Sequence, residues 1–440
     1  MSGSQGRLSP TDNPRPPEPP APPILGHTLP YARDPLGFVE QTVAEYGPIV
    51  SFRIPRQEGV LLAEPAAIRH VLADNTSNYR KGNFQRRELE GLLGDGLLLS
   101  EGTDWESARR AIQPAFDPSQ IADYTASMIE RTDSYITDWK PSETIDLVNV
   151  TSEITLSILG EVLFDTDFED ATAVRAAARA VTNRFSPDSR VPFHVPDWVP
   201  LPRNIQYRHA VKRLNKFVDD LLAERRSAPS EESDLLSALR SADMDDDEIR
   251  DHLVTFLLAG HETTALALTY TLYCLATHPE EQAAVVDEVT TLDGKPTIGQ
   301  PLPRTDRAIR EAMRLYPPIH LIMREATEDD VVEGYHVPAD ALVVCSQWAT
   351  HRRPDLFSDP TAYRPTRWKE IDPPEYAYFS FGGGPRMCIG RRFALLEARL
   401  VLARLLQQYR FDPVTKDLDF AVSTTLAPNH PVKARLRVHN

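Results

Sequence analysis

The chain has 440 residues, a formal net charge of −16 at pH 7, and 41% hydrophobic residues. Nucleic-acid phosphates reward clustered Lys and Arg, so the acidic balance argues against a nucleic-acid partner. The length allows a large core, and no change of composition divides the chain after its first residues.

Residues 1–24 differ in composition from the rest of the chain. Eight prolines fall between Pro10 and Pro23, with few apolar residues among them. This composition is typical of a mobile polyproline-like tail, so we expect residues 1–24 to be disordered and residues 25–440 to form a single domain. The N-terminus shows no basic segment followed by a long apolar run, so we expect neither a secretory signal nor a membrane anchor.

Helical patterns dominate the first half of the chain. Residues 34–46 are predicted to form a helix, and residues 48–54 and 59–63 two short strands. Apolar positions at helical spacing predict further helices over residues 105–116, 121–139, 145–163 and 204–223. The five prolines in residues 186–202 predict an irregular connection between helices.

The longest predicted helix covers residues 246–277 and would span about 45 Å at the usual helical rise. From residue 253 onward it is apolar almost all round, which is typical of a transmembrane span or of a helix that crosses a large core. Gly260-His261-Glu262 lies in mid-segment, and a carboxylate there is costly in lipid, so we expect a core helix. Short strands follow at 331–337 and 341–345. The expected fold class is mainly α with a small β region (α+β).

Within this helix, Ala259 and Gly260 stand beside an acid, Glu262, and a hydroxyl, Thr263. The small residues let a ligand approach the backbone, and the Thr263 hydroxyl can reach the carbonyl of Ala259 one turn earlier. Such a groove suits dioxygen and a chain of waters. Simple satisfaction of polar groups in a core helix is the alternative, and this motif alone does not decide between them.

Further along the chain, Glu311-Ala-Met-Arg314 places an acid and a base one helical turn apart. On an exposed helix such a pair contributes a few tenths of a kcal/mol and indicates no function.

The last motif, Phe381-Gly-Gly-Gly-Pro-Arg386-Met-Cys388-Ile-Gly390, places a cysteine just before a predicted helix over 391–406. Free N–H groups and the dipole of that helix, with Arg386 nearby, favour a thiolate. Three consecutive glycines cost backbone entropy unless the chain bends sharply or approaches something closely. The thiolate could act as a nucleophile, a zinc ligand or an axial ligand of haem iron. Because the other cysteines, Cys274 and Cys345, lie far away in sequence, we expect no disulfide and no structural zinc.

The pattern Phe-x-x-Gly-x-Arg-x-Cys-x-Gly resembles the haem-binding loop of the cytochrome P450 family of haem-thiolate monooxygenases, and every fixed position is matched. With the other motifs in the same order, the resemblance extends from about residue 25 to the end. It implies the family's fold, with haem b (iron protoporphyrin IX) between the long central helix and the cysteine-loop helix. Cys388 would then be the axial ligand of the haem iron.

The resemblance also gives roles to the other motifs. Glu262 and Thr263 correspond to the acid–alcohol pair that delivers protons to dioxygen. Glu311 and Arg314 correspond, with Arg367, to a buried triad that braces the loop under the haem, a structural role. The family's other cofactor-binding residues correspond to Trp105, Arg109, Arg324, Phe381 and Arg386.

Pocket-lining residues follow from the same resemblance. They are Phe256, Ala259 and Leu321, with the stretches 82–100, 186–202, 318–323 and 424–426. Most of these residues are apolar. We therefore expect a lipophilic small-molecule substrate such as a fatty acid, a terpenoid or a carotenoid, although core packing would produce the same composition.

The activity implied is a monooxygenase reaction, with O2 as co-substrate, that inserts one oxygen atom by hydroxylation or epoxidation. Electrons are expected from a separate ferredoxin or flavodoxin-type partner with its reductase, which docks near Arg391 and Arg392. We expect a cytoplasmic monomer. Two alternatives remain open: a peroxide-driven hydroxylase of the same fold, which would be expected to lack the acid–alcohol pair, and a non-catalytic haem-thiolate sensor, which would need no proton relay.

Overall fold

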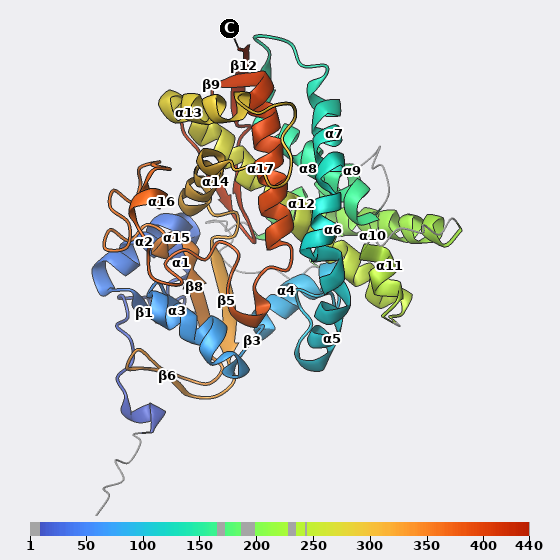
Figure 1. Ribbon diagram of the computed structural model, residues 1–440. Coiled ribbons are helices and arrows are strands. Elements are labelled where there is room, and N and C mark those ends of the chain that lie inside the picture. The colour runs from blue at the N-terminus through green and yellow to red at the C-terminus, as the bar shows by residue number, and fades with distance from the viewer. Residues whose placement is uncertain (1–8, 165–171, 186–198, 228–234, 243, 440) are drawn as a thin grey trace, which may run out of the picture.

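The computed structural model describes residues 9–439 apart from 165–171, 186–198, 228–234 and 243, and apart from the side chains of residues 84 and 88. Helices fill most of the molecule, and the largest sheet lies at the lower left in Figure 1. This arrangement confirms the predicted fold class, mainly α with a small β region. The predicted irregular connection at 186–202 falls largely outside the described residues.

The described helices differ widely in length. The α-helices are α1 (Thr28–Arg33), α2 (Pro35–Tyr46), α3 (Pro65–Arg69), α4 (Asn83–Leu93), α5 (Gly102–Ile112), α6 (Pro118–Asp123), α7 (Thr125–Ile136), α8 (Leu147–Phe164), α9 (Thr172–Phe185), α10 (Pro202–Ser227), α11 (Leu235–Arg240), α12 (Asp246–Thr277), α13 (Pro279–Thr290), α14 (Pro303–Leu315), α15 (Gln347–Thr350), α16 (Arg367–Glu370) and α17 (Arg391–Gln408).

The strands form one larger sheet and three small ones. They are β1 (Ile49–Ile54), β2 (Gln57–Leu62), β3 (Tyr79–Arg80), β4 (Thr144–Asp146), β5 (Leu321–Ala326), β6 (Asp330–Val332), β7 (Tyr335–Val337), β8 (Leu342–Ser346), β9 (Tyr409–Pro413), β10 (Phe420–Val422), β11 (Leu426–Pro428) and β12 (Lys433–Val438). The five-stranded sheet has the order β1-β2-β8-β5-β3, in which only the β2–β8 pair is parallel. The small sheets are β4-β12-β9, β6-β7 and β10-β11.

Helix α12 crosses the core, as predicted, and its bounds match the expected residues 246–277. Its start is fixed by a capping box in which Asp245 and Glu248 each accept the other's backbone N–H. It packs against α8, α14 and α17. A Cβ at Gly260 would lie 3.3 Å from Cδ1 of Leu159, so this small residue permits the close approach of α8.

By length and composition, α8 is the one helix of the described chain that could cross a membrane. Two thirds of it is buried inside the protein (67%), mainly against α12 and α7, which is the environment of a core helix. The helix expected over 145–163 begins only at Leu147, because Ile145 pairs with Ala434 of β12 as part of a strand.

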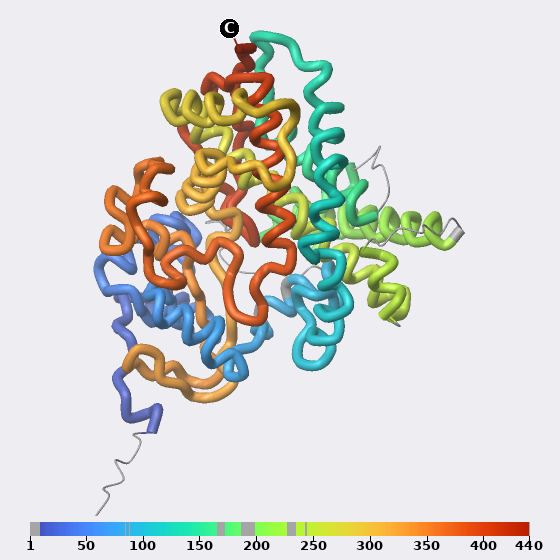
Figure 2. The backbone as a smooth tube through the Cα atoms, viewed as in Figure 1, coloured from blue at the N-terminus to red at the C-terminus, as the bar shows by residue number. Residues whose placement is uncertain are grey.

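The N-terminal segment from Ser9 to Ile24 lies against the larger sheet and the β6–β7 hairpin (Figure 2). The carbonyl of Pro17 accepts a hydrogen bond from Ser51 N at 2.8 Å, and the carbonyl of Pro14 accepts one from His336 N at 2.9 Å. Pro16 and Pro19 are buried. The expectation of a mobile tail is therefore wrong for residues 9–24, because β1 and β7 each supply a backbone donor to a proline carbonyl.

Candidate active site

A cavity of about 690 Å³ lies between α12, the start of α17, α5, the first residues of β5 and the turn between β10 and β11. Its walls are mostly apolar, and Phe256 and Phe116 stack on one side with ring centroids 5.6 Å apart. Cys388, Glu262 and Thr263 all line this cavity. The cysteine motif, which suggests thiolate chemistry, and the acid–alcohol motif, which suggests proton transfer, therefore border the same cavity.

The loop before α17 turns sharply enough to place Cys388 at the cavity wall. Gly384 has φ +63°, and a Cβ there would fall 1.7 Å from the carbonyl oxygen of Leu72, so the loop needs glycine. The backbone N–H of Cys388 donates to the carbonyl of Phe381 at 3.0 Å, which closes the loop. The Cys388 side chain is accessible from the cavity.

Burial in the protein interior raises the pKa of the Cys388 thiol, while the N–H of Gly390, Arg109 and Arg391 lower it. The expectation that Arg386 supplies the nearby positive charge is not met. Its guanidinium instead pairs with Glu101 at 2.6 Å and lies 4.4 Å from the centre of the Trp105 ring. The described residues contain no group of three or more His, Cys, Asp and Glu side chains placed to hold a metal ion, and so no such ligand set for zinc that includes Cys388.

Cationic side chains gather on the same cavity. Lys81, Arg109, Arg324 and Arg386 all line it. Burial lowers the pKa of Lys81 well below its usual value, and Arg324 and Arg386 lower it further. Burial also lowers the pKa of Arg324, whose guanidinium donates to the carbonyl of Met323.

Glu101, through its pair with Arg386, supplies the one ion pair that the described residues give to this cationic group. Buried cations without counter-ions are costly, so the group is complementary to a ligand that carries carboxylates. Haem fits this requirement, because its two propionates would pair with these cations while its ring lay against the apolar walls. Lys81 was missed by the sequence analysis, since one lysine in a loop carries no pattern.

The middle of α12 has the local hydrogen bonds expected from its sequence. Thr263 Oγ1 donates to the Ala259 carbonyl at 2.8 Å, and Thr264 Oγ1 donates to the Gly260 carbonyl at 3.2 Å. The Glu262 carboxyl accepts a hydrogen bond from Thr425 Oγ1 at 3.2 Å, between β10 and β11. Burial raises the pKa of Glu262 to about 7, although hydrogen bonds from Thr425 and Thr182 oppose this shift. Glu262 is thus suited to gain and lose a proton near neutral pH.

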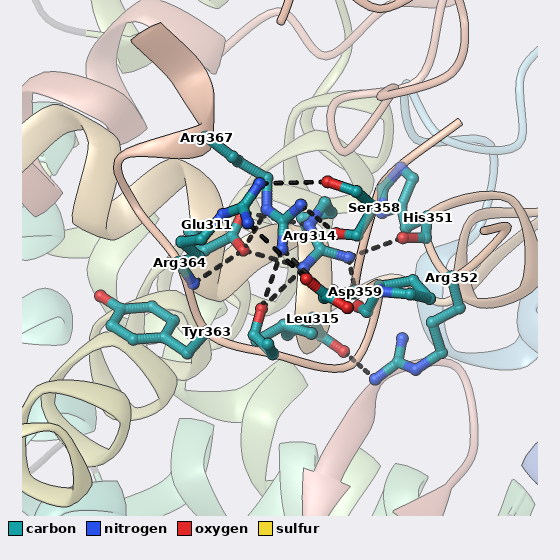
Figure 3. Close-up of polar contacts among 12 residues, drawn as sticks. Glu311, Arg314, Leu315, His351, Arg352, Ser358, Asp359, Tyr363, Arg364 and Arg367 are labelled. Carbon is teal, nitrogen blue, oxygen red and sulfur yellow. Dashed lines mark hydrogen bonds and ion pairs between the residues drawn. The ribbon is translucent and has the colours of Figure 1, made fainter. Parts of the chain in front are cut away.

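The predicted triad of Glu311, Arg314 and Arg367 is brought together with all three side chains fully buried (Figure 3). Glu311 Oε1 lies 2.8 Å from Arg314 Nη2 and 2.7 Å from Arg367 Nε. The remaining guanidinium N–H groups donate to backbone carbonyls of residues 351–362. The charges are therefore paired and hydrogen-bonded, which a buried ionic network requires.

Hydrogen bonds connect this triad to the cysteine loop. Arg314 Nη1 donates to the carbonyl of His351 at 2.7 Å, and His351 Nε2 accepts from the backbone N–H of Phe379 at 3.2 Å. The carbonyl of Phe379 in turn accepts from Gly382 N at 2.7 Å. The triad is thus linked to the first glycine of the loop that holds Cys388.

The remaining predicted residues mostly meet at the cavity. Trp105, Phe256, Ala259, Leu321 and Phe381 line it, as does every residue of 318–323. Leu426 does not line the cavity and packs with Trp348 and Val422. The cavity is also lined by His27, Gln347 and Trp348. These three residues lie outside every recognised motif and were not predicted from the sequence.

The chain is similar to known proteins over nearly its whole length. The family model for cytochrome P450 matches residues 16–436. This chain belongs to the cytochrome P450 family. The P450 chain is 34% identical to cyclooctat-9-en-7-ol 5-monooxygenase of Streptomyces melanosporofaciens, over 93% of this chain and 94% of that one. It is 32% identical to pentalenene oxygenase of Streptomyces avermitilis, over 96% of each chain.

Among solved structures, CYP175A1 from Thermus thermophilus matches with a TM-score of 0.78 and 27% identity, over 92% of this chain and 96% of that one. The fold is therefore the cytochrome P450 fold, and the chain is a P450 monooxygenase, an oxidoreductase. Members of this family bind haem and use dioxygen.

Proposed function

We propose that this P450 binds haem b in the cavity through Cys388 and inserts one atom of O2 into a lipophilic substrate. The observation that supports this proposal is the position of Cys388 on the wall of the same cavity that Glu262 and Thr263 line. Haem would supply the site at which dioxygen is bound and reduced. Overall, substrate, O2, two electrons and two protons give the oxygenated product and water.

The chain's own residues have distinct tasks in this proposal. Arg109, Arg324, Arg386 and Lys81 hold the propionates, Trp105 lies beside them, and Phe381, at the start of the cysteine loop, borders the cavity. The triad of Glu311, Arg314 and Arg367 keeps the loop in place. The iron ligand would be Cys388 as a thiolate, since binding to a metal compensates the burial that otherwise keeps the thiol protonated.

Proton delivery is the task of Glu262 and Thr263. Glu262 exchanges protons near neutral pH and lies within hydrogen-bond distance of Thr425. The Thr263 hydroxyl is held by the Ala259 carbonyl, so its oxygen has a fixed position at the cavity wall and can accept a hydrogen bond there.

Among lipophilic molecules, we propose a terpenoid as the substrate. The cavity is mostly apolar, and the two Streptomyces relatives are named as oxygenases of cyclooctat-9-en-7-ol and pentalenene. Fatty acids and carotenoids would also be accommodated by apolar walls, so a substrate screen should include all three classes.

Electrons would come from a ferredoxin or flavodoxin-type partner with its reductase. Arg391 and Arg392 are exposed at the start of α17, directly after the cysteine loop, and offer positive charge to an acidic partner. We further propose that residues 25–440 form one haem domain and that the protein is a cytoplasmic monomer.

Isotopically labelled dioxygen tests the proposal. The purified protein, a ferredoxin, its reductase and a terpene substrate should give a product that contains one labelled oxygen atom, identified by mass spectrometry. Product formed with peroxide and without reductant or dioxygen would favour the peroxide-driven alternative. Substrate binding without any product, whichever redox partner is supplied, would favour the sensor.

A further inference from the structure

Three polar side chains outside the groups discussed above meet on one wall of the cavity. His320 directly precedes β5, and Gln347 and Trp348 directly follow β8. The antiparallel register pairs Leu321 with Ser346, so the next pair in the same register is His320 with Gln347. The backbone N–H of Trp348 donates to the His320 carbonyl at 3.0 Å, which holds Trp348 beside His320. All three line the cavity.

Every polar atom of these side chains lacks a hydrogen-bond partner among the described residues. This holds for both ring nitrogens of His320, both amide atoms of Gln347 and Nε1 of Trp348. Their exposed fractions are only 4%, 1% and 7%. Buried polar groups are nearly always hydrogen-bonded, and an unpaired one is costly. Several such atoms on one cavity wall indicate a ligand group that pairs with them.

The cluster has both donors and acceptors but no free charge. Burial lowers the pKa of His320 to about 4, so its ring is neutral and offers one donor and one acceptor. Gln347 offers both kinds of group, and Trp348 offers a donor. Arg352 stacks on the Trp348 ring at 3.2 Å, but it pairs with Glu40 at 3.2 Å and does not line the cavity. A neutral group that both donates and accepts is therefore the best match.

We propose that His320, Gln347 and Trp348 form a subsite that binds a hydroxyl group already present on the substrate. The proposal rests on the proposed function, since it takes this cavity as the substrate pocket. The substrate is then a lipophilic molecule with one polar end, and the anchored hydroxyl decides which distant carbon is oxidised. An earlier reaction that installs an oxygen atom must supply this substrate.

The test compares the binding of two probes with one carbon skeleton, the alcohol farnesol and the hydrocarbon farnesene. Isothermal titration calorimetry gives the dissociation constant of each for the haem-loaded wild type, Gln347→Leu and His320→Leu. Gln206→Leu is the matched control, because Gln206 is exposed on α10 and does not line the cavity. The ratio of the two dissociation constants, compared between proteins, cancels the difference in probe solubility.

The ratio of the farnesene to the farnesol dissociation constant should be about tenfold larger for the wild type than for either cluster variant. Gln206→Leu should keep the wild-type ratio. Equal ratios in the wild type and in both cluster variants would overturn the subsite. A loss of preference in Gln206→Leu as large as in the cluster variants would overturn it too. If ordered water, and not the substrate, formed the hydrogen bonds of the cluster, the ratios would be equal in the wild type and in both cluster variants.

Thermal unfolding of the ligand-free variants separates this role from a structural one. Because Gln347 loses no hydrogen bond on replacement, the melting temperature of Gln347→Leu should equal or exceed that of the wild type. A clear decrease would mean that Gln347 has structural partners and would contradict the proposal. The carbon monoxide spectrum of each preparation is recorded in parallel. Thiolate haem with unchanged ratios refutes the subsite alone, whereas absence of thiolate haem refutes the proposed function.

Discussion

Glu262 is the residue whose titration should be visible in the stability of the whole protein. Its pKa rises from 4.5 to about 7 because of burial, so the folded state holds this proton more tightly than the unfolded chain. The stability that this proton contributes is complete below pH about 4.5 and is lost as the pH rises through about 7.

The prediction is that Glu262→Gln gains stability relative to the wild type as the pH rises. Urea unfolding at pH 5 and pH 8 should show the difference in unfolding free energy shift by about 1–3 kcal/mol in favour of the variant, after allowance for access from the cavity. The amide keeps an acceptor for Thr425. A difference that is the same at both pH values would show that Glu262 titrates normally.

The Lys81 side chain should destabilise the haem-free protein and should help the haem-bound protein to retain its haem. Its charge is buried beside Arg324 and Arg386, so Lys81→Met should stabilise the haem-free protein. The same change should speed the transfer of haem to apomyoglobin by about tenfold, since a charge-assisted hydrogen bond is lost. Lys140→Met, at an exposed position, is the control. If Lys81→Met changed neither quantity, Lys81 would not belong to the propionate site.

The residues that could be predicted are those whose role depends on local spacing. Thr263 reaches Ala259 one turn earlier, and the glycines before Cys388 are required by a close backbone approach. Lys81 and Gln347 could not be predicted from spacing, because their neighbours are brought by distant segments. His320 was expected at the pocket only as part of the stretch 318–323, with no partner or role of its own. Gln347, for example, stands opposite His320 only because β5 pairs with β8.

Among the elements, α14 and the segment after α15 depend on the buried triad. Arg367→Met leaves Glu311 with one cationic partner and leaves the Ser358 carbonyl without a donor. The carbonyls of Asp359 and Ala362 each lose one of their two donors. The expected loss of unfolding free energy is about 3–5 kcal/mol, together with reduced haem content because the cysteine loop is no longer braced.

Removal of an exposed ion pair is the control for this experiment. Lys216 and Asp220 are 2.5 Å apart on α10 with both side chains mostly exposed, so Lys216→Ala should cost at most about 1 kcal/mol. Equal effects of the two substitutions in urea unfolding would contradict a special role for the triad.

The bounds of a helix could be predicted where its ends carry local sequence signals, such as a capping box or a proline. Helix α12 starts at the Asp245–Glu248 capping box and ends before His278-Pro279, and its predicted bounds are confirmed. Helix α8 was predicted two residues too early because Ile145 is apolar in either structure, and only its pairing with Ala434 makes it part of a strand.

At the scale of the whole molecule, the prediction of a mobile N-terminal segment, made from its composition, was wrong for residues 9–24. Proline-rich sequence cannot form a core, but its carbonyls can still pair with an open sheet edge. Deletion of residues 1–24 should therefore speed amide hydrogen exchange at Ser51 and His336, whose N–H groups bond to Pro17 and Pro14. Leu147, whose N–H bonds to Val432, should be unaffected. Unchanged exchange rates at Ser51 and His336 would support the original expectation that this segment is mobile.

The spectrum of the dithionite-reduced protein with carbon monoxide tests the central claim most directly, in the wild type and in Cys388→Ser. A strongly red-shifted Soret band in the wild type that disappears in Cys388→Ser is expected, because a thiolate changes the electronic structure of the haem. Cys345→Ala is the matched control: burial raises the pKa of this thiol to about 12, and its band should match the wild type. No haem in the wild type, or a band typical of histidine ligation in all three proteins, would contradict the account.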